Sequence, residues 1–182
     1  MSLKTVLVKH SNWPIWKGRI ETSDVLRNIA VKQVLDLFAT KAIRQATGGQ
    51  NYPISSPFFN NLYERFVFIA KKNFDFSLSL QNLNTCWAYV SNKESNETGW
   101  HNHKLTSTLN GVYYLQMNSS ASGIRFRQNG QELLLKPQVN DLLIFPNELE
   151  HYPVPSTDDN RISINMEILA NEKVESIFNS TK

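Results

Sequence analysis

The chain has 182 residues, of which 41% are hydrophobic and 11% aromatic, a composition ordinary for a globular protein of one domain. The net charge is +3 and the basic residues are scattered, so we expect no nucleic-acid-binding surface. Cys86 is the only cysteine, which excludes an intrachain disulfide and a metal site built from several thiolates. No apolar segment has the length of a membrane span or of a secretion signal, so we expect a cytoplasmic protein without membrane association.

Helical periodicity marks the N-terminal part of the sequence. Apolar residues recur at steps of three and four from Ser23 to about Ala46, which predicts an amphipathic helix. A second helix is predicted to begin at Ser56–Pro57, because a capping serine followed by proline is a favoured helix start, and to run to about Asn73. Near the start of the chain, residues 5–8 (TVLV) form a candidate edge strand.

After residue 80 the sequence consists of short apolar runs separated by turn-forming segments such as NSSASG and QNG. The predicted strands cover residues 83–90, 109–117, 123–128, 132–136, 141–146, 151–155 and 161–169. Seven closely spaced strands favour an antiparallel sandwich or open barrel. We therefore predict a single domain over residues 1–182, with a mostly helical support region (1–80), a β core (81–170) and a C-terminal tail (171–182).

Three of the four histidines lie in the predicted β region. In the segment GWHNHKLT, an extended backbone would place His101 and His103 on the same face, where both imidazoles can reach one cation. His151 follows the strongly apolar strand LLIF. A His-x-His pair alone is more often part of a polar loop than of a metal site. The interpretation as a metal site therefore depends on the residues that accompany the histidines.

A polar stripe begins ten residues beyond His151. Alternation in the segment RISINM puts Arg161, Ser163 and Asn165 on one face of a strand and apolar residues on the other. A guanidinium beside a hydroxyl offers a forked, charge-assisted grip for a carboxylate. Nitrogen and oxygen ligands with open coordination positions suit Fe(II). The combination indicates an iron oxygenase that uses a 2-oxo acid.

The order and spacing of these segments resemble the 2-oxoglutarate- and Fe(II)-dependent oxygenases. The resemblance covers residues 87–169, about half the chain, and is carried by HNH, STLNGVYYLQ, SGIRFRQ, DLLIFPNELEHYPVP and NRISINMEI. It is greatest to a small group with the signature His-x-His, SGVYYL, LLIFPS-x-L-x-H-x-V-P and R-I-S-I-x-F. The resemblance implies a mainly β fold with flanking α-helices, namely a cupin-like double-stranded β-helix (jelly roll) packed against the two helices of the N-terminal half.

The resemblance also implies roles for individual residues. His101 and His151 would bind the iron. The residues implied for 2-oxoglutarate are a grip on its distal carboxylate and neighbours that line its pocket: Arg161 and Ser163, then Tyr113, Tyr114 and Asn165. No catalytic residue is predicted beyond the metal centre.

Position 103 departs from the superfamily, where His-x-Asp or His-x-Glu is usual. A facial triad normally has two histidines and one carboxylate. We favour His101, His103 and His151 as joint ligands. In the alternative, only one histidine of the pair binds the metal, and a carboxylate from elsewhere completes the site. The carboxylates considered for that place are Glu94, Glu97, Asp141 and Glu150.

The predicted function is an Fe(II)- and 2-oxoglutarate-dependent dioxygenase. It would use O2 to convert 2-oxoglutarate to succinate and CO2 while hydroxylating a C–H bond of a small molecule or of a peptide or protein side chain. The alternative is a cupin-type metal-binding jelly roll, such as a sensor, an isomerase or a sugar-binding module, which does not need the grip of Arg161 and Ser163. A third interpretation is an interaction domain whose site has decayed. We expect a monomer or a homodimer.

Overall fold

The structure is a computed structural model that describes residues 8–9, 12–40, 51–81, 85–91, 99–117, 123–156 and 160–179. The helices are α1 (Asp24–Thr40), α2 (Pro57–Asn73) and α3 (Val174–Asn179). The strands are β1 (Val8–Lys9), β2 (Trp16–Arg19), β3 (Asn51–Pro53), β4 (Thr85–Ser91), β5 (Leu109–Gln116), β6 (Ile124–Gln128), β7 (Gln131–Leu135), β8 (Asp141–Pro146), β9 (Glu150–Pro153) and β10 (Arg161–Ile168). All seven strands predicted after residue 80 are present, with ends shifted by at most two residues.

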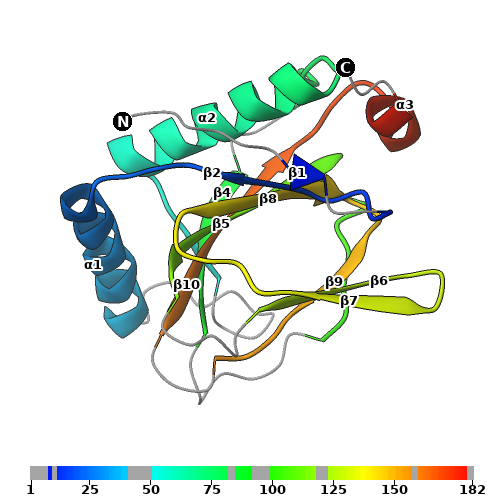
Figure 1. Cartoon of the computed structure of the whole chain (residues 1–182). Helices are drawn as coiled ribbons and strands as arrows, with labels where there is room; N and C mark the ends of the chain where they lie inside the picture. Colours follow the sequence, from blue (N-terminus) through cyan, green and yellow to red (C-terminus); the bar gives the residue numbers. More distant parts are fainter. Residues whose placement is uncertain are drawn as a thin grey trace.

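The strands form two antiparallel sheets that face each other, with the helices outside the larger sheet (Figure 1). The larger sheet has the order β1-β2-β8-β5-β10-β4-β3, and the smaller sheet has the order β7-β6-β9. β10 is an interior strand of the larger sheet and is hydrogen-bonded to β5 on one side and to β4 on the other. This arrangement is the mainly β architecture with flanking helices that the sequence predicts.

Two layers of apolar side chains fill the fold. In β8 the side chains alternate between them: Leu142 and Ile144 pack on the helix side, whereas Leu143 and Phe145 lie between the two sheets. Because both faces of β8 are buried, its sequence is a continuous run of apolar residues. The helix-side layer receives from α2 a stripe of buried residues: Phe59, Leu62, Tyr63, Phe66, Ile69 and Ala70.

Helix α1 packs on the sheet less fully than its periodicity predicts. Ala30 and Val34 are buried, but Leu26 and Ile29, which belong to the same predicted apolar face, are 42% and 52% exposed. Only the middle and later turns of the helix therefore contact the core within the described residues. The predicted end of this helix, residues 41–46, lies outside the described residues.

Several short elements are not predicted by the sequence pattern. β2, β3 and α3 have four, three and six residues, too few to show a period. Helix α3 falls within the predicted C-terminal tail, yet it completes the core. The ring of Phe178 lies 4.6 Å from that of Trp16 and 5.2 Å from that of Phe74, measured between centroids. The candidate strand at residues 5–8 is described only at Val8, which begins β1.

Gly111 of β5 makes room for α2. A Cβ atom at this position would lie 2.7 Å from Cε2 of Phe66, whose ring is fully buried. Overpacking a core costs about 1–3 kcal/mol. We therefore expect Gly111→Ala to lower the free energy of unfolding by about 1–3 kcal/mol in urea denaturation, and the double variant with Phe66→Leu to recover part of the loss. Equal stability of Gly111→Ala and the wild type would contradict this close packing.

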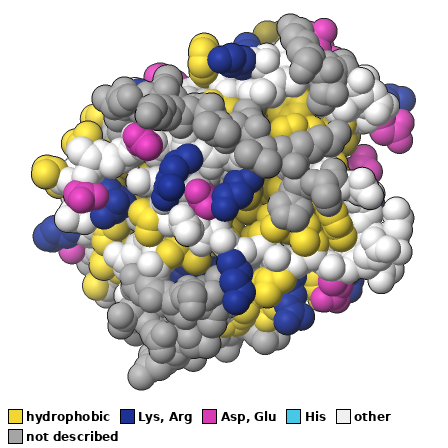
Figure 2. All heavy atoms as spheres, viewed as in Figure 1, with side chains coloured by type: hydrophobic (Ala, Val, Ile, Leu, Met, Phe, Trp, Pro, Cys, Tyr) yellow, Lys and Arg dark blue, Asp and Glu magenta, His cyan; other side chains and the backbone are white. Residues whose placement is uncertain are grey.

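The surface of the described residues carries mixed charge. On the face shown in Figure 2, Lys and Arg side chains are interspersed with Asp and Glu side chains. Exposed pairs include Lys32 with Asp36, whose charged atoms are 2.6 Å apart, and Arg125 with Glu132 at 3.6 Å. Within the described ranges, no helix has both the length and the apolar character needed to cross a membrane.

Candidate functional site

His101 and His151 lie opposite each other on neighbouring segments. His151 belongs to β9, and His101 precedes β5. The His101 N–H donates to the His151 carbonyl over 3.1 Å, and the His151 N–H donates to the His101 carbonyl over 2.9 Å. Two residues that exchange both backbone hydrogen bonds project their side chains to the same face. The centroids of the two rings are accordingly 4.3 Å apart.

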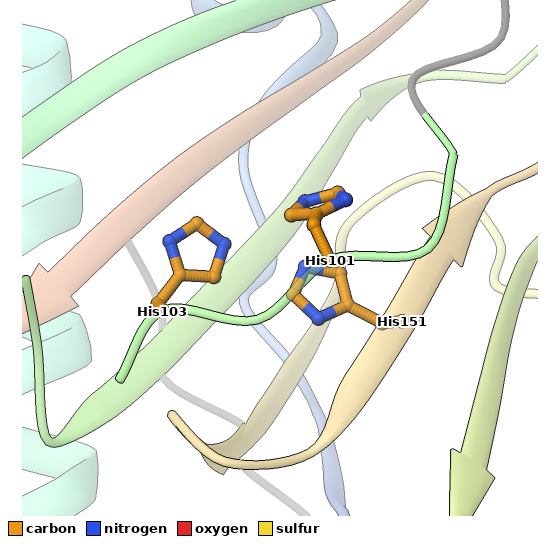
Figure 3. A group of neighbouring side chains, drawn as sticks. All are labelled: His101, His103 and His151. Carbon is orange, nitrogen blue, oxygen red and sulfur yellow. The ribbon is translucent and has the colours of Figure 1, made fainter. Parts of the chain in front are cut away.

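His103 joins this pair from two residues further along the chain. Its N–H donates to the Asn147 carbonyl over 2.9 Å, which holds the segment beside the turn after β8. Figure 3 shows the three rings close together, two from the segment before β5 and one from β9. One ligand atom from each ring lies within 4.8 Å of the others. Among the described residues, this is the only group of three or more His, Cys, Asp or Glu side chains with that spacing.

Each of the three rings has an oxygen atom close to Nδ1. In His101 and His151 the acceptor is the backbone carbonyl two residues earlier, at 3.1 Å in both cases. Beside Nδ1 of His103 lies Oε1 of Glu167, at 2.7 Å. Since carbonyl and carboxylate oxygens only accept, Nδ1 carries the hydrogen, and a neutral ring keeps its lone pair on Nε2. All three Nε2 atoms can therefore serve as metal ligands.

The surroundings of two of the rings favour their neutral form. Burial lowers the pKa of His151 well below its ordinary value of 6.5, and the neighbouring His101 and His103 lower it further. Burial also lowers the pKa of His101, against a raising effect from its hydrogen bond to Gly99. A metal binds the neutral imidazole, so these shifts keep the rings ready to ligate at neutral pH.

The lowered pKa of His151 predicts a pH-dependent stability. Below pH 6.5 the unfolded chain takes up a proton at this residue that the folded chain resists. Stability decreases as the pH is lowered wherever the unfolded state binds more protons than the folded state. In chelator-treated protein, we expect the free energy of unfolding to decrease as the pH drops from about 7 to about 5, a window above most carboxylate titration. His151→Gln cannot titrate and should show a shallower slope in urea denaturation. An identical slope in both proteins would contradict the prediction.

The histidines form part of the wall of a cavity of about 260 Å³. Seven of the eight residues predicted for the site line this cavity, Tyr113 being the exception. Much of the remaining wall is apolar or aromatic and includes Trp87, Ile124 and Pro153. The three strands β4, β5 and β10 supply one side of the cavity, and β6 and β9 of the smaller sheet supply the other. The structure thus brings the metal-binding and carboxylate-binding candidates into one chamber.

Tyr113 and Tyr114 occupy opposite faces of β5. Tyr114 pairs in register with Ser163 of β10 and lines the cavity, and burial raises the pKa of its phenol, which therefore stays protonated. Tyr113 lies in the helix-side layer, where its hydroxyl donates to Oδ1 of Asn140 over 2.7 Å. Of the two tyrosines predicted beside the co-substrate, only Tyr114 lines this cavity. Successive residues of a strand face opposite ways, so both could not.

Arg161 is 1% exposed and is one of the residues that line the cavity. Its Nη1 donates to the backbone carbonyls of Gly123, over 2.8 Å, and of Val154, over 2.7 Å. Its Nε and Nη2 have no hydrogen-bond partner among the described residues. A Cβ on Gly123 would collide with the backbone oxygen of Leu135, so a glycine is needed to keep that carbonyl in place. The Nε–Nη2 edge is the fork that binds a carboxylate with two parallel hydrogen bonds.

Glu167 belongs to the site but is not predicted by the sequence analysis. It is the fourth residue of the alternating face that begins at Arg161, two residues beyond Asn165, and it is 6% exposed. Its Oε1 lies 2.7 Å from Nδ1 of His103 and accepts a hydrogen bond from Oγ1 of Thr106 over 2.9 Å. The signal for it was present, since the alternation continues unbroken from Arg161 to Glu167.

The carboxylates considered as an alternative third ligand are engaged elsewhere or lie outside the described residues. The carboxylate of Asp141 is 2.7 Å from Nζ of Lys17, and that of Glu150 is 2.7 Å from Nε of Arg127. Neither belongs to the group of converging ligand atoms. Glu94 and Glu97 lie outside the described residues.

Comparison with known proteins gives matches only at the level of structure. No protein-family model matches the sequence, and no curated protein does. A prolyl hydroxylase from Trichoplax adhaerens, solved with a peptide fragment of the hypoxia inducible factor oxygen degradation domain, has a TM-score of 0.70 and 13% identity, covering 94% of this chain and 89% of its own. A prolyl-4-hydroxylase from Pseudomonas putida has a TM-score of 0.65 and 11% identity, with coverages of 89% and 95%. HygX from Streptomyces hygroscopicus, solved with nickel and 2-oxoglutarate, has a TM-score of 0.64 and 11% identity, with coverages of 85% and 81%.

At these identities the likeness establishes the fold alone. The two facing antiparallel sheets with helices on the outer side of the larger one form a double-stranded β-helix. The fold predicted from the sequence is therefore confirmed.

Proposed function

We propose that this protein is an Fe(II)- and 2-oxoglutarate-dependent dioxygenase that hydroxylates a C–H bond. The observation that carries the proposal is the joint presence, in one cavity, of three histidines with available Nε2 atoms and of a buried arginine whose Nε and Nη2 have no hydrogen-bond partner among the described residues. Neighbours in fold that are named as prolyl hydroxylases, and one solved with nickel and 2-oxoglutarate, support this reading.

The histidines fit a ferrous ion. Imidazole nitrogen suits iron, and three protein ligands leave coordination positions for a co-substrate and O2. His101, His103 and His151 would hold the metal through Nε2, because an oxygen atom of the chain already lies beside each Nδ1. Fixing the second nitrogen of a ligating imidazole sets the orientation of the ring and its tautomer. The donor set is thus preorganised by the chain itself.

Arg161 and Ser163 would hold the distal carboxylate of 2-oxoglutarate. A buried donor without an acceptor costs about 1–3 kcal/mol, more for a charged group. The Nε–Nη2 edge of Arg161, which has no acceptor in the described part of the chain, therefore favours an anionic ligand. Ser163 lies on the same face of β10, opposite Tyr114, whose protonated phenol is a further donor. Asn165 lines the cavity two residues further along the strand. These groups match a planar carboxylate rather than a neutral ligand.

Iron and 2-oxoglutarate together supply the oxidising chemistry, in which O2 and 2-oxoglutarate are consumed, succinate and CO2 are released, and one oxygen atom enters the substrate as a hydroxyl group. The chain's contribution is to position the co-substrate and to exclude bulk water. Apolar side chains such as Trp87 and Ile124 line the cavity beside the polar groups. We propose a small molecule or a peptide or protein side chain as the substrate.

A cupin-type sensor, isomerase or sugar-binding module would use the same histidines without 2-oxoglutarate. Such a protein has no need for a buried guanidinium whose fork faces no acceptor among the described residues. The Arg161 edge is therefore the observation that favours the oxygenase over this alternative.

The test is turnover of 2-oxoglutarate by the purified protein with ferrous iron, ascorbate and O2, followed as succinate by mass spectrometry. Slow succinate formation is expected even without the true substrate, and it should stop when a chelator removes the metal. Binding of 2-oxoglutarate is measured in parallel by calorimetry with Ni(II) in place of Fe(II). A folded protein that binds no 2-oxoglutarate with any of these metals would sink the proposal.

A further inference from the structure

We propose that Glu167 is a positioning residue of the metal centre. Its carboxylate, held against Nδ1 of His103, supplies the negative charge that a facial triad of two histidines and one carboxylate takes from a direct ligand. The inference rests on the proposed metal site and concerns how that site is oriented and charged.

The contacts of Glu167 call for a cation nearby. Its side chain is 8% exposed, and Oε1 lies 2.7 Å from Nδ1 of His103. Among the described residues, His103 is the only ionisable partner within 4.0 Å of this carboxylate. Buried carboxylates are costly unless a charge compensates them, and a neutral imidazole compensates poorly. A divalent cation on Nε2 of the same ring would provide that compensation.

Glu167 is also well placed to fix a ring. It lies in β10, an interior strand of the larger sheet, paired with Thr85 of β4 and with Asn110 of β5. Its backbone carbonyl accepts a hydrogen bond from the buried Tyr63 hydroxyl of α2 over 2.9 Å. His103 itself lies outside any strand. The carboxylate therefore connects a ligand on a turn-rich segment to a strand that is hydrogen-bonded on both sides.

The three rings are not supported equally. In His101 and His151, Nδ1 is hydrogen-bonded to a neutral backbone carbonyl, whereas in His103 it lies 2.7 Å from a carboxylate oxygen. A charged acceptor at Nδ1 makes the imidazole a stronger base at Nε2. His103 is the position where the family pattern has Asp or Glu. In this chain the carboxylate therefore does not bind the metal directly. It contacts the imidazole of His103, which binds the metal in its place.

The first test is Co(II) binding by Glu167→Gln, titrated by visible absorbance. Glutamine keeps the size of the side chain and an oxygen acceptor but removes the charge. Loss of a group that supports a metal ligand costs roughly 10–100-fold in affinity, and we expect the Co(II) Kd to rise by that factor. Asp141→Asn is the matched control, because Asp141 is equally buried, at 4% exposed, but pairs with Lys17 away from the histidines. Its Co(II) Kd should stay unchanged.

A second variant and an NMR spectrum test the role of Glu167 even if Glu167→Gln folds poorly. Thr106→Val retains the carboxylate but removes the hydroxyl that donates to Oε1, and Thr106 is exposed, so this variant should fold and lose less affinity than Glu167→Gln. In Zn(II)-loaded protein with ¹⁵N-labelled histidine, the Nδ1–H resonance of His103 should lie downfield of the other two. It should move upfield in Glu167→Gln, which a purely structural role would not cause.

An unchanged Co(II) Kd in folded Glu167→Gln, or a His103 resonance like those of His101 and His151, would overturn the inference. A loss of binding as complete as in His151→Ala would overturn it too, because Glu167 would then be a direct ligand. In both cases the metal site itself stands if the wild type binds Co(II). Absence of Co(II) binding by the wild type would contradict the proposed metal site, and the inference with it.

Discussion

Arg161→Ala is expected to bind 2-oxoglutarate at least about 30-fold more weakly than the wild type, with metal affinity unchanged. Removing one partner of a buried, hydrogen-bonded charge pair costs about 2–5 kcal/mol, and each 1.4 kcal/mol is a factor of about ten in Kd. Arg161 lines the same cavity as the histidines but is not among the converging ligand atoms. Calorimetry with Ni(II) measures the 2-oxoglutarate affinity, and Co(II) titration measures the metal affinity.

Two further variants sharpen this experiment. Arg161→Lys keeps the positive charge but has no planar fork, so its 2-oxoglutarate affinity should fall between those of the wild type and Arg161→Ala. Arg125→Ala removes an exposed arginine on the outer face of β6, 3.6 Å from Glu132, and should bind 2-oxoglutarate normally. Loss of metal binding in folded Arg161→Ala would show that the roles of the two groups are assigned wrongly.

His151→Ala is expected to bind Fe(II) or Co(II) more than roughly 100-fold more weakly than the wild type. Removing a group that only supports a ligand lowers metal affinity by about 10–100-fold, and removing the ligand itself should lower it further. His151 is 5% exposed, and its backbone is paired with that of His101. Succinate formation should fall to the level of chelator-treated protein. A metal that binds only the native state also raises its stability by mass action, so the rise in Tm with added Co(II) should disappear.

The control for this variant is Asn102→Ala. Asn102 lies between two of the proposed ligands, but its side chain is exposed and does not line the cavity. Its Co(II) affinity and its Tm response should match those of the wild type. His151 also packs against Phe145, with ring centroids 4.9 Å apart, so the metal-free Tm of His151→Ala must be recorded first. Normal Co(II) binding by the folded variant would remove His151 from the ligand set.

The strands of the β half could be predicted because each is long enough to show its own pattern. β8 reads as a continuous apolar run and β10 as an alternation, and both are present at the predicted positions. β2 and β3 could not be predicted. They are strands because β2 pairs with β8 and β3 pairs with β4, with Trp16 opposite Ile144 and Tyr52 opposite Ala88. Pairing with a distant strand leaves no signal in so short a segment.

Helix α1 shows a second limit of periodicity. The three- and four-residue spacing identifies the helix and the face that includes Leu26, Ile29 and Val34, yet only Val34 of these is buried. A periodic apolar face shows which side of a helix can be buried. It does not show how far along the helix the partner sheet extends, because that depends on how the helix is placed on the sheet.

The sequence by itself determined which side chains share a face: Arg161 with Ser163 and Asn165 on one strand, and His101 with His103 in one extended segment. Tertiary structure decided that these faces meet in one cavity, that Tyr114 rather than Tyr113 lines it, and that the carboxylate of Glu167 meets His103. Alternation is a local property of the extended backbone and sorts residues into two faces without saying which is inside. The contact between Glu167 and His103 joins segments far apart in the chain, and it depends on the packing that places the turn before β5 beside the end of β10.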